Sequence, residues 1–314
     1  MTETSSTAPL NTGPLNTGPL KIGIIGLGAI GCLISSQLPS TCKIYALPRK
    51  TNNPSTYISF QLNREKKKQT YQWPIWQGEG LDIVLVCCKA SQCDQALQQW
   101  HAAIGPDTQI VLLQNGLGQH DNLRKTFPHH AIFAASTTEG AFRSSPNLIT
   151  HAGIGQTQWG LYGGEVQEFK LPLASLKGEH QWADNIQQVL LDKLAINAVI
   201  NPLTVKYQCK NGELLTHAQA FSDLTLLCEE TEMFFHSMTW PLSFNLFEKS
   251  QLIARLTANN FSSMLQDVQN KRSTEIDFIN GYLLNKATAN NLALPFSQSL
   301  VELVKSHESE KKVC

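Results

Sequence analysis

The chain has 314 residues, which suits two domains, and its hydrophobic fraction of 42% provides apolar side chains for two cores. Lys plus Arg and Asp plus Glu each total 25, so the formal net charge is +0, which argues against a surface for nucleic acid or an anionic membrane. The apolar runs are too short to span a membrane, and the eight cysteines show no paired CxxC spacing, so we expect neither a metal centre nor a disulfide framework.

Residues 1–20 differ in texture from the rest of the chain. They contain two adjacent copies of Asn-Thr-Gly-Pro-Leu, a composition that does not pack and predicts a disordered tail. The start of the chain lacks the basic and apolar stretches of a secretory signal. We therefore expect a cytoplasmic protein with reduced thiols.

From Lys21 onward, short apolar strands alternate with helical segments. Strands are expected at 21–25, 43–47, 81–88, 108–113 and 132–136, with helices at 29–38 and 91–101. This alternation predicts a Rossmann-type α/β domain at 21–185, with a parallel sheet and helices on both faces. The strands then stop, and helical patterns follow at 186–201, 218–238, 248–269, 275–291 and 296–309. We therefore expect an all-α second domain at 186–314.

A glycine-rich turn joins the first strand to the first helix. Its sequence is Gly26-Leu27-Gly28-Ala29-Ile30-Gly31, the GxGxxG spacing in the strand-to-helix context that dinucleotide binding requires. The first glycine permits a tight turn, the second lets the backbone approach a pyrophosphate, and the third allows close helix–strand packing. The free N–H groups and dipole of the helix start then attract phosphate.

The end of the second strand indicates which dinucleotide is bound. An NAD site would place an acidic residue there, whereas this chain has Leu47-Pro-Arg-Lys50. Two cations suit a 2′-phosphate, so we expect NADPH, with Arg49 as the main contact. Lys89 and Asn115 each follow a central strand, where a parallel sheet binds its ligands, although either could simply be a turn residue.

A polar stripe interrupts the apolar run at 193–204. Lys193, Asn197 and Asn201 are spaced i, i+4, i+8 and share one helical face. Burying a cation with two amides is costly unless something binds them, so the stripe indicates a site rather than a helix–helix contact. A buried lysine has a lowered pKa and can donate a proton near neutral pH. Pro202 is expected to kink or end the helix.

Several blocks of the chain carry a family resemblance. They are Lys21 to Gly31, Gln114-Asn-Gly-Leu-Gly118, Lys193 to Thr204, Asn211-Gly-Glu-Leu214, Ser262 to Asp267, and Thr274 to Gly281. Through these blocks, which spread over 21–310, the sequence resembles the ketopantoate reductases (2-dehydropantoate 2-reductases), the NADPH enzymes of pantothenate biosynthesis.

The resemblance implies roles for individual residues. Lys193 would be the proton donor, and Glu275 would lie at the junction of cofactor and substrate. The implied substrate residues are Asn115, Lys193, Asn197, Asn201, Asn211, Asn260, Ser262 and Ser263, and the implied cofactor contacts include Lys89, Asn115 and Ala141 besides the glycine-rich turn. The chain departs from the family at Glu139, where histidine is frequent, and at Asp192.

Local chemistry offers second interpretations of some of these residues. Thr274 to Asp277 has the pattern of a capping box, which would fix the carboxylate of Glu275 at a helix start. Ser262 and Ser263 can donate hydrogen bonds to a substrate carboxylate, and Ser263 can equally be helix surface. Alternatives for the whole chain are an NADP-dependent reductase of another 2-keto acid and a non-catalytic NADPH sensor. We expect a small-molecule substrate, no nucleic acid or membrane partner, and a monomer or homodimer.

Overall fold

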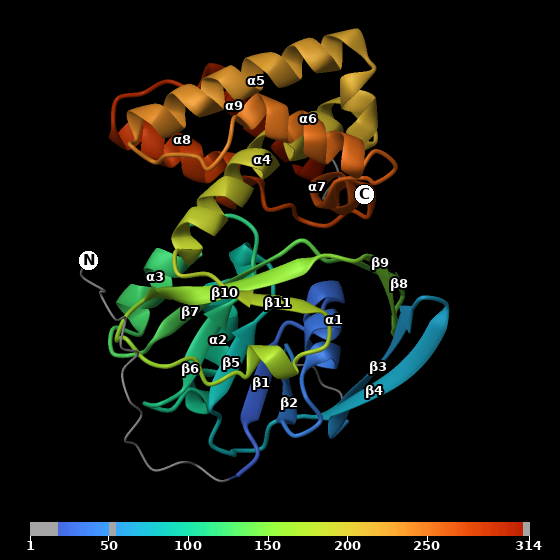
Figure 1. The fold of residues 1–314 in the computed structure, drawn as a ribbon, viewed down its shortest axis with the longest axis vertical. Coiled ribbons are helices and arrows are strands. Elements are labelled where there is room, and N and C mark those ends of the chain that lie inside the picture. The colour runs from blue at the N-terminus through green and yellow to red at the C-terminus, as the bar shows by residue number, and fades with distance from the viewer. Residues whose placement is uncertain (1–17, 50–54, 310–314) are drawn as a thin grey trace, which may run out of the picture.

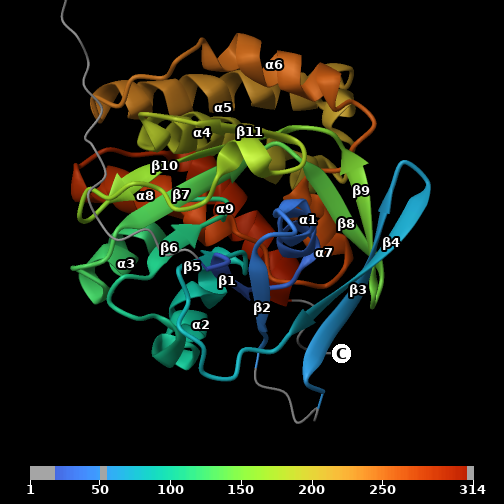
Figure 2. The same cartoon turned by 60° about the horizontal axis from the view of Figure 1, so that its bottom comes forward.

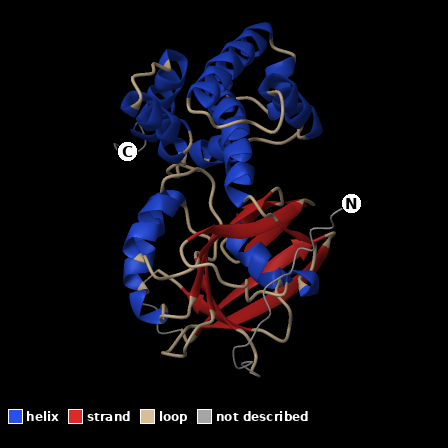
Figure 3. Ribbon diagram, turned by 60° about the vertical axis from the view of Figure 1, so that its left-hand side comes forward, coloured by secondary structure: helices blue, strands red, loops and turns tan. Residues whose placement is uncertain are grey.

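The computed structural model describes residues 18–49 and 55–309. Strands gather at one end of the molecule and most of the helical ribbon lies at the other, as Figure 3 shows by colour. The predicted class, a Rossmann-type α/β domain followed by an all-α domain, is confirmed. The predicted tail at 1–20 and Lys50 lie almost wholly outside the described residues.

A seven-stranded sheet forms the base of the fold, in the order β11-β10-β7-β6-β5-β1-β2. Its strands are β1 (Lys21–Ile25), β2 (Lys43–Leu47), β5 (Ile83–Val86), β6 (Gln109–Leu112), β7 (Ile132–Thr137), β10 (Gln156–Gly163) and β11 (Glu179–Trp182). Five neighbouring strands run parallel to one another, as predicted; in order across the sheet they are β2, β1, β5, β6 and β7. β10 and β11 extend the sheet beyond the prediction, with β10 antiparallel to β7.

Helices cover both faces of this sheet. α1 (Ala29–Gln37) packs on one face, where Ile34 joins a cluster with Ile24 and Leu85. α2 (Cys93–Gln99) and α3 (Gln119–Thr126) pack on the other, through Leu97 and Leu123. Successive strand residues point to opposite faces, so the continuous apolar run of β5 fills both clusters.

The sequence did not predict a second sheet, of four strands, which lies beside α1 (Figure 2). It contains β3 (Tyr57–Arg64), β4 (Lys67–Pro74), β8 (Gly140–Ser145) and β9 (Leu148–Gly153), in the order β4-β3-β9-β8. The basic run Arg64 to Lys68 forms the β3–β4 hairpin end, where Glu65 and Lys66 have positive φ. A β-hairpin thus stands where a crossover helix is usual between parallel strands.

Six α-helices follow β11. They are α4 (Ile186–Tyr207), α5 (Ala218–Ser237), α6 (Leu246–Leu256), α7 (Ser263–Gln269), α8 (Asn280–Ala289) and α9 (Pro295–Ser309). The pattern at 248–269, predicted as one helix, is broken, because α6 ends before Thr257 and Ser262 caps a new helix by accepting from Leu265 N. Within the described ranges, no helix is long and apolar enough to cross a membrane.

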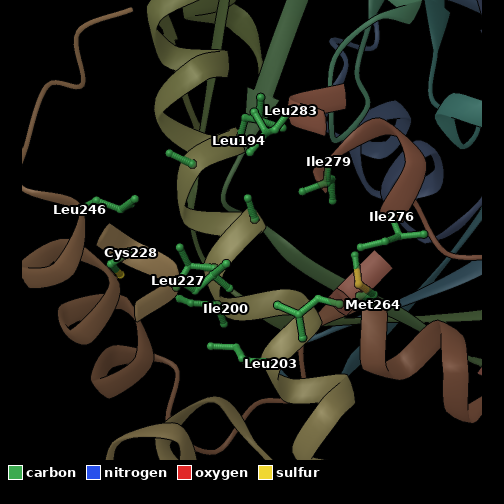
Figure 4. Packing of buried hydrophobic residues seen from close by; sticks show 14 of the residues in the cluster. Leu194, Ile200, Leu203, Leu227, Cys228, Leu246, Met264, Ile276, Ile279 and Leu283 are labelled. Atoms are coloured by element: carbon green, nitrogen blue, oxygen red, sulfur yellow. The ribbon is translucent and has the colours of Figure 1, made fainter. Parts of the chain in front are cut away.

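α4 is the centre of the helical core (Figure 4). Its Leu194, Ile200 and Leu203 belong to one cluster with Leu227 of α5, Met264 of α7 and Leu283 of α8. The helix does not end at Pro202 but runs on to Tyr207. Tertiary packing on every side outweighs the missing backbone donor of the proline. The same helix begins against β7 and β10, so it joins the sheet to the helical domain (Figure 1).

Candidate active site

The glycine-rich turn has the geometry that a dinucleotide needs. Gly26 has φ +85, and a Cβ there would lie 2.3 Å from the backbone N of Cys88; a Cβ on Gly31 would lie 2.2 Å from the carbonyl of Gly26. Gly28, by contrast, faces open space, with no atom within 4 Å of its Cβ position. α1 starts there with no side-chain cap and no acidic residue in its first turn. The turn therefore offers unoccupied N–H groups and room for a pyrophosphate.

Arg49 lies just beyond the end of β2, exposed, at the last position before a gap in the described residues. The strand end is anchored, because the carbonyl of Pro48 accepts hydrogen bonds from Gln99 Nε2 at 2.9 Å and Trp100 Nε1 at 3.1 Å. An exposed guanidinium on an anchored strand end is well placed to meet a ribose phosphate.

Asn115 and Glu275 meet across the two domains. Asn115 Nδ2 donates to Glu275 Oε2 at 3.1 Å, and the backbone N of Ala90 donates to Oε1 at 3.3 Å. Burial raises the pKa of Glu275, and these two hydrogen bonds act against that rise. The turn around Asn115 is closed by Leu117 N, which donates to the carbonyl of Phe278 at 2.9 Å.

The predicted capping box is wrong in detail. Thr274 Oγ1 accepts from Ile276 N, and Asp277 pairs with Lys305 instead of closing a cap. The predicted helix at 275–291 is divided, with a short 3-10 helix, Ile276–Phe278, directly after Glu275 and α8 beginning at Asn280. The carboxylate of Glu275 is therefore held by Asn115 and Ala90 of the Rossmann domain and not by a capping box.

Lys89 also reaches the helical domain. Its ammonium pairs with Asp267 Oδ2 of α7 at 2.6 Å and donates to the carbonyl of Ser273. Asp267 in turn accepts from Arg272 Nε at 3.0 Å. In this structure the charge of Lys89 thus serves the contact between domains, on the same edge where a cofactor contact was expected.

Lys193 is directed at the end of β7. Its Nζ donates to the carbonyl of Thr137 at 2.8 Å. Burial lowers the pKa of the lysine from 10.5 to about 8, while the charge of Glu275 acts in the opposite direction. The group is thus a cation near neutral pH, and its lowered pKa makes it a better proton donor than an ordinary lysine. Asp192 points away, because its carboxylate accepts from Gln188 Nε2 and Ser243 N.

The asparagines of the helical domain differ in how they are held. Asn197 and Asn201 follow Lys193 on one face of continuous α4, the first partly buried and the second buried. Asn211 is buried, with Nδ2 bound to Thr257 Oγ1 at 2.9 Å and Oδ1 without a partner. A buried amide oxygen without a partner is costly, which suits a ligand-facing group. Asn260 is exposed and accepts from Asn211 N through its carbonyl.

The two serines have different environments. The buried Ser262 hydroxyl caps α7 and shares a 2.6 Å hydrogen bond with Thr204 Oγ1. Ser263 is exposed at the first position of α7. The hydroxyl of Ser262 is therefore committed to the fold, and Ser263 is the accessible one of the pair.

Glu139 is buried two residues after Thr137. Its carboxylate accepts from Gln37 Nε2 of α1 at 3.1 Å and contacts His151 Nε2 of β9, and both side chains of this pair are at most 2% exposed. Its backbone N donates to Thr137 Oγ1 at 3.1 Å. Glu139 thus braces the backbone that accepts from Lys193.

Ala141 lies on β8 and packs against a cluster that includes Cys32 and Leu33 of α1. Two positions on, Arg143 donates through Nη2 to the carbonyl of Leu27 at 2.8 Å, inside the glycine-rich turn. Sequence reasoning missed Arg143 because it did not predict β8. The available signal was the i, i+2 spacing, which places Ala141 and Arg143 on the same face of a strand. Across residues 18–49 and 55–309, no group of three or more His, Cys, Asp or Glu side chains could hold a metal.

These residues lie along one edge. The parallel strands β1, β5, β6 and β7 end, respectively, at the glycine-rich turn, Lys89, Asn115 and Thr137, and the helical domain supplies Lys193 and Glu275 opposite them. A glycine-rich turn after the first strand, together with a buried carboxylate held across the domain boundary, is typical of two-domain, nucleotide-dependent oxidoreductases of the Rossmann type.

Comparison with known proteins identifies the family. The models of the ketopantoate reductase PanE/ApbA domain and of its C-terminal domain match residues 22–164 and 185–308. The 2-dehydropantoate 2-reductase of Escherichia coli O157:H7 is 35% identical over 238 residues, 73% of this chain and 75% of that protein. That of Vibrio cholerae is 33% identical over 72% of this chain and 78% of its own length. The chain belongs to the ketopantoate reductase family.

Solved structures agree in fold. A probable 2-dehydropantoate 2-reductase from Bacillus subtilis superposes with a TM-score of 0.76 at 26% identity, covering 92% of this chain and 100% of that one. A D-mandelate dehydrogenase in complex with NADH and anilino(oxo)acetate reaches a TM-score of 0.82 at 23% identity, over 93% and 100%. At that identity the second likeness shows the fold alone.

Proposed function

We propose that this protein reduces 2-dehydropantoate (ketopantoate) to pantoate with NADPH, a step of pantothenate biosynthesis. The observation that carries the proposal is the partly buried Lys193, whose ammonium is held at the sheet edge and is acted on by the charge of Glu275, the partner of Asn115. The curated relatives that share most of the chain support the reaction and the substrate.

The row of residues along the sheet edge orients the reaction. Neighbouring strands lie about 4.8 Å apart, so the edge provides successive positions for the parts of an extended dinucleotide. In our proposal Arg49, after β2, holds the 2′-phosphate, and residues Gly26 to Gly31, after β1, hold the pyrophosphate. Lys89 and Asn115, after β5 and β6, then meet the nicotinamide end, beside Lys193.

The nicotinamide supplies the hydride when it is bound. Lys193 holds the proton that the ketone oxygen must gain, and its charge stabilises the alkoxide as it develops. Glu275 keeps Asn115 in place and favours the charged form of Lys193. Asn197, Asn201 and Asn211 are proposed to bind the substrate hydroxyl, and Ser263 and Asn260 its carboxylate end. The work divides between residues 21–185 for the cofactor and 186–314 for the substrate.

The test is oxidation of NADPH by the purified protein, followed at the absorbance of the reduced nicotinamide. The expected result is rapid turnover with 2-dehydropantoate and NADPH, much slower turnover with NADH, and none without keto acid. Pyruvate, 2-ketoisovalerate and benzoylformate are assayed separately as alternative substrates. A higher kcat/KM for any of these than for 2-dehydropantoate would reject the assigned substrate.

A second candidate is a reductase of another 2-keto acid. The protein of similar fold that was crystallised with NADH and anilino(oxo)acetate is a D-mandelate dehydrogenase, named for a different 2-hydroxy acid. The same assay separates the two. A third candidate, an NADPH sensor without turnover, is disfavoured by the presence of both Lys193 and Glu275 in contact with the sheet edge.

We further propose a monomer or homodimer that works in the cytoplasm. A structural neighbour from Staphylococcus aureus is described as a dimeric ketopantoate reductase. The described cysteines are all free, which suits a reducing compartment. Sedimentation of the purified full chain would decide between the two oligomeric states.

A further inference from the structure

The second sheet places one guanidinium directly on the glycine-rich turn. Arg143 of β8 donates through Nη2 to the carbonyl of Leu27 at 2.8 Å and through Nη1 to the carbonyl of Pro146. Its neighbour on the strand face, Ala141, packs against α1, so this face of β8 is turned towards the helix that starts at the turn. Both hydrogen bonds hold the head group by neutral carbonyls.

The charge of Arg143 is not balanced by protein. In the part of the chain that the structure describes, ion pairs join other cations to Asp or Glu, but no carboxylate pairs with Arg143. The charge of Arg143 acts on the Cys32 thiol in the first turn of α1. Burial raises its pKa to about 12, and the Arg143 charge acts against that rise. The guanidinium therefore lies beside a neutral thiol with N–H donors to spare.

The same place is where our proposed function puts a dianionic group. The turn has open space at Gly28, and α1 begins with uncapped N–H groups and no acidic side chain. Backbone N–H groups and a helix dipole attract a pyrophosphate but carry no full charge. An exposed arginine that is fixed to the turn by Leu27 supplies that charge, and its planar fork matches two phosphate oxygens.

We propose that Arg143 binds the pyrophosphate of the dinucleotide cofactor, so that the phosphate site is built from both sheets of the Rossmann domain. The inference rests on the proposed use of NADPH. It assigns the two phosphate groups to two different arginines, with Arg143 at the pyrophosphate and Arg49 at the 2′-phosphate. The bond to Leu27 positions the guanidinium before the cofactor arrives.

The experiment measures binding, not turnover. Calorimetry of the full chain uses NADPH, ADP-ribose (pyrophosphate without 2′-phosphate) and, in competition, adenosine 2′-monophosphate (2′-phosphate without pyrophosphate). The variants are Arg143→Met, which keeps the aliphatic stem, Arg49→Met, and the matched control Arg64→Met at the end of β3 in the same sheet. Thermal unfolding without ligand checks each variant.

Arg143→Met is expected to weaken NADPH and ADP-ribose by about 10–100-fold, as for a lost charged hydrogen bond, and to leave adenosine 2′-monophosphate unchanged. Arg49→Met should show the reverse pattern for the two fragments, and Arg64→Met should change neither. Equal weakening of both fragments by Arg143→Met would mean that the arginine only shapes the turn. Unchanged ADP-ribose binding, or a wild-type protein that does not bind ADP-ribose, would also overturn the proposal.

This design separates the inference from the proposed reaction. A wild-type protein that binds NADPH without reducing 2-dehydropantoate would refute the reaction, while the fragment pattern of Arg143→Met would still be measured. Arg143→Lys provides a further readout, because it keeps the charge and loses the fork. Its affinity for ADP-ribose should fall between those of wild type and Arg143→Met.

Discussion

Lys193 Nζ donates a 2.8 Å hydrogen bond to the main-chain carbonyl of Thr137, which lies 56 residues earlier in the chain. The bond joins the second turn of α4 to the carboxyl end of β7. A carbonyl is a neutral partner, so it orients the ammonium without supplying the full counter-charge that would hold the proton tightly. The lysine is thereby both positioned and ready to donate.

Removing this ammonium should strongly reduce turnover and leave the binding of the cofactor unchanged. Lys193→Ala is expected to lower kcat by about 10²–10⁴-fold, the usual contribution of one well-placed acid, with the Kd for NADPH unchanged. Single-turnover kinetics and calorimetry measure the two quantities. Lys206→Ala is the control, since Lys206 is on the same helix but pairs with Asp223 of α5. Near-normal turnover of Lys193→Ala would reject the proton-donor role.

The pH profile should follow the state of Lys193. The donor is active when protonated, and its pKa is lowered from 10.5 to about 8, so kcat/KM should fall as pH rises above about 8. The charge of Glu275 raises that pKa, so in Glu275→Gln the alkaline limb should move to lower pH. A limb that stays in place, or moves upward, would show that the two groups are not coupled.

Arg49 should decide between the two dinucleotides. Arg49→Glu is expected to raise the KM for NADPH by about 10–100-fold, because a charge-assisted contact is replaced by repulsion, and to leave the KM for NADH unchanged or lower. Lys43→Glu, at the opposite end of β2, controls for the change in net charge. An unaltered KM for NADPH in Arg49→Glu would reject the assignment of Arg49 to the 2′-phosphate site.

Gly116 should accept no side chain without a loss of stability, because it lies where the two domains meet. It has φ +80, and a Cβ would lie 2.3 Å from the carbonyl O of Phe278. Gly116→Ala is therefore expected to cost of order 1–3 kcal/mol and to lower kcat by shifting Asn115 away from Glu275. Urea unfolding and steady-state kinetics measure both effects. Gly80→Ala, in open space and without positive φ, should be silent.

Glu139 should be a stabilising residue although its carboxylate is buried. Glu139→Ala leaves the buried side chains of His151 and Gln37 without their hydrogen-bond partner, so it is expected to cost about 1–3 kcal/mol in urea unfolding. The double variant with His151→Ala should lose less than the sum of the single losses. Strict additivity would mean that the two side chains do not interact, and the exposed Glu179→Ala is the control.

Local pattern was sufficient for the elements that are continuously apolar or strictly helical. β1, β5 and α4 have such patterns, and the stripe of Lys193, Asn197 and Asn201 does lie on one face of a single helix. The glycine-rich turn could also be predicted, because its spacing has meaning between a strand and a helix.

The second sheet could not be predicted in the same way. β4 is mostly exposed and rich in lysine and glutamine, so it lacks the apolar signal of a strand. β3 is held partly by pairing with β9, some 90 residues away, at Gln61 to Leu148 and its neighbours. Such pairing is long-range and leaves no local trace. Arg143 and the Glu139–His151 pair were missed for this reason.

α4 also sets a measure of distance. Lys193 lies seven residues after the first residue of the helix, Ile186, which rests against the sheet, so its backbone stands roughly 10 Å along the axis. One inserted residue would move it by about 1.5 Å and turn it by about 100°. The number of residues from 186 to 193 therefore fixes the position from which the lysine donates its proton, and an insertion there would displace it. The β3–β4 hairpin end, by contrast, is open to insertions.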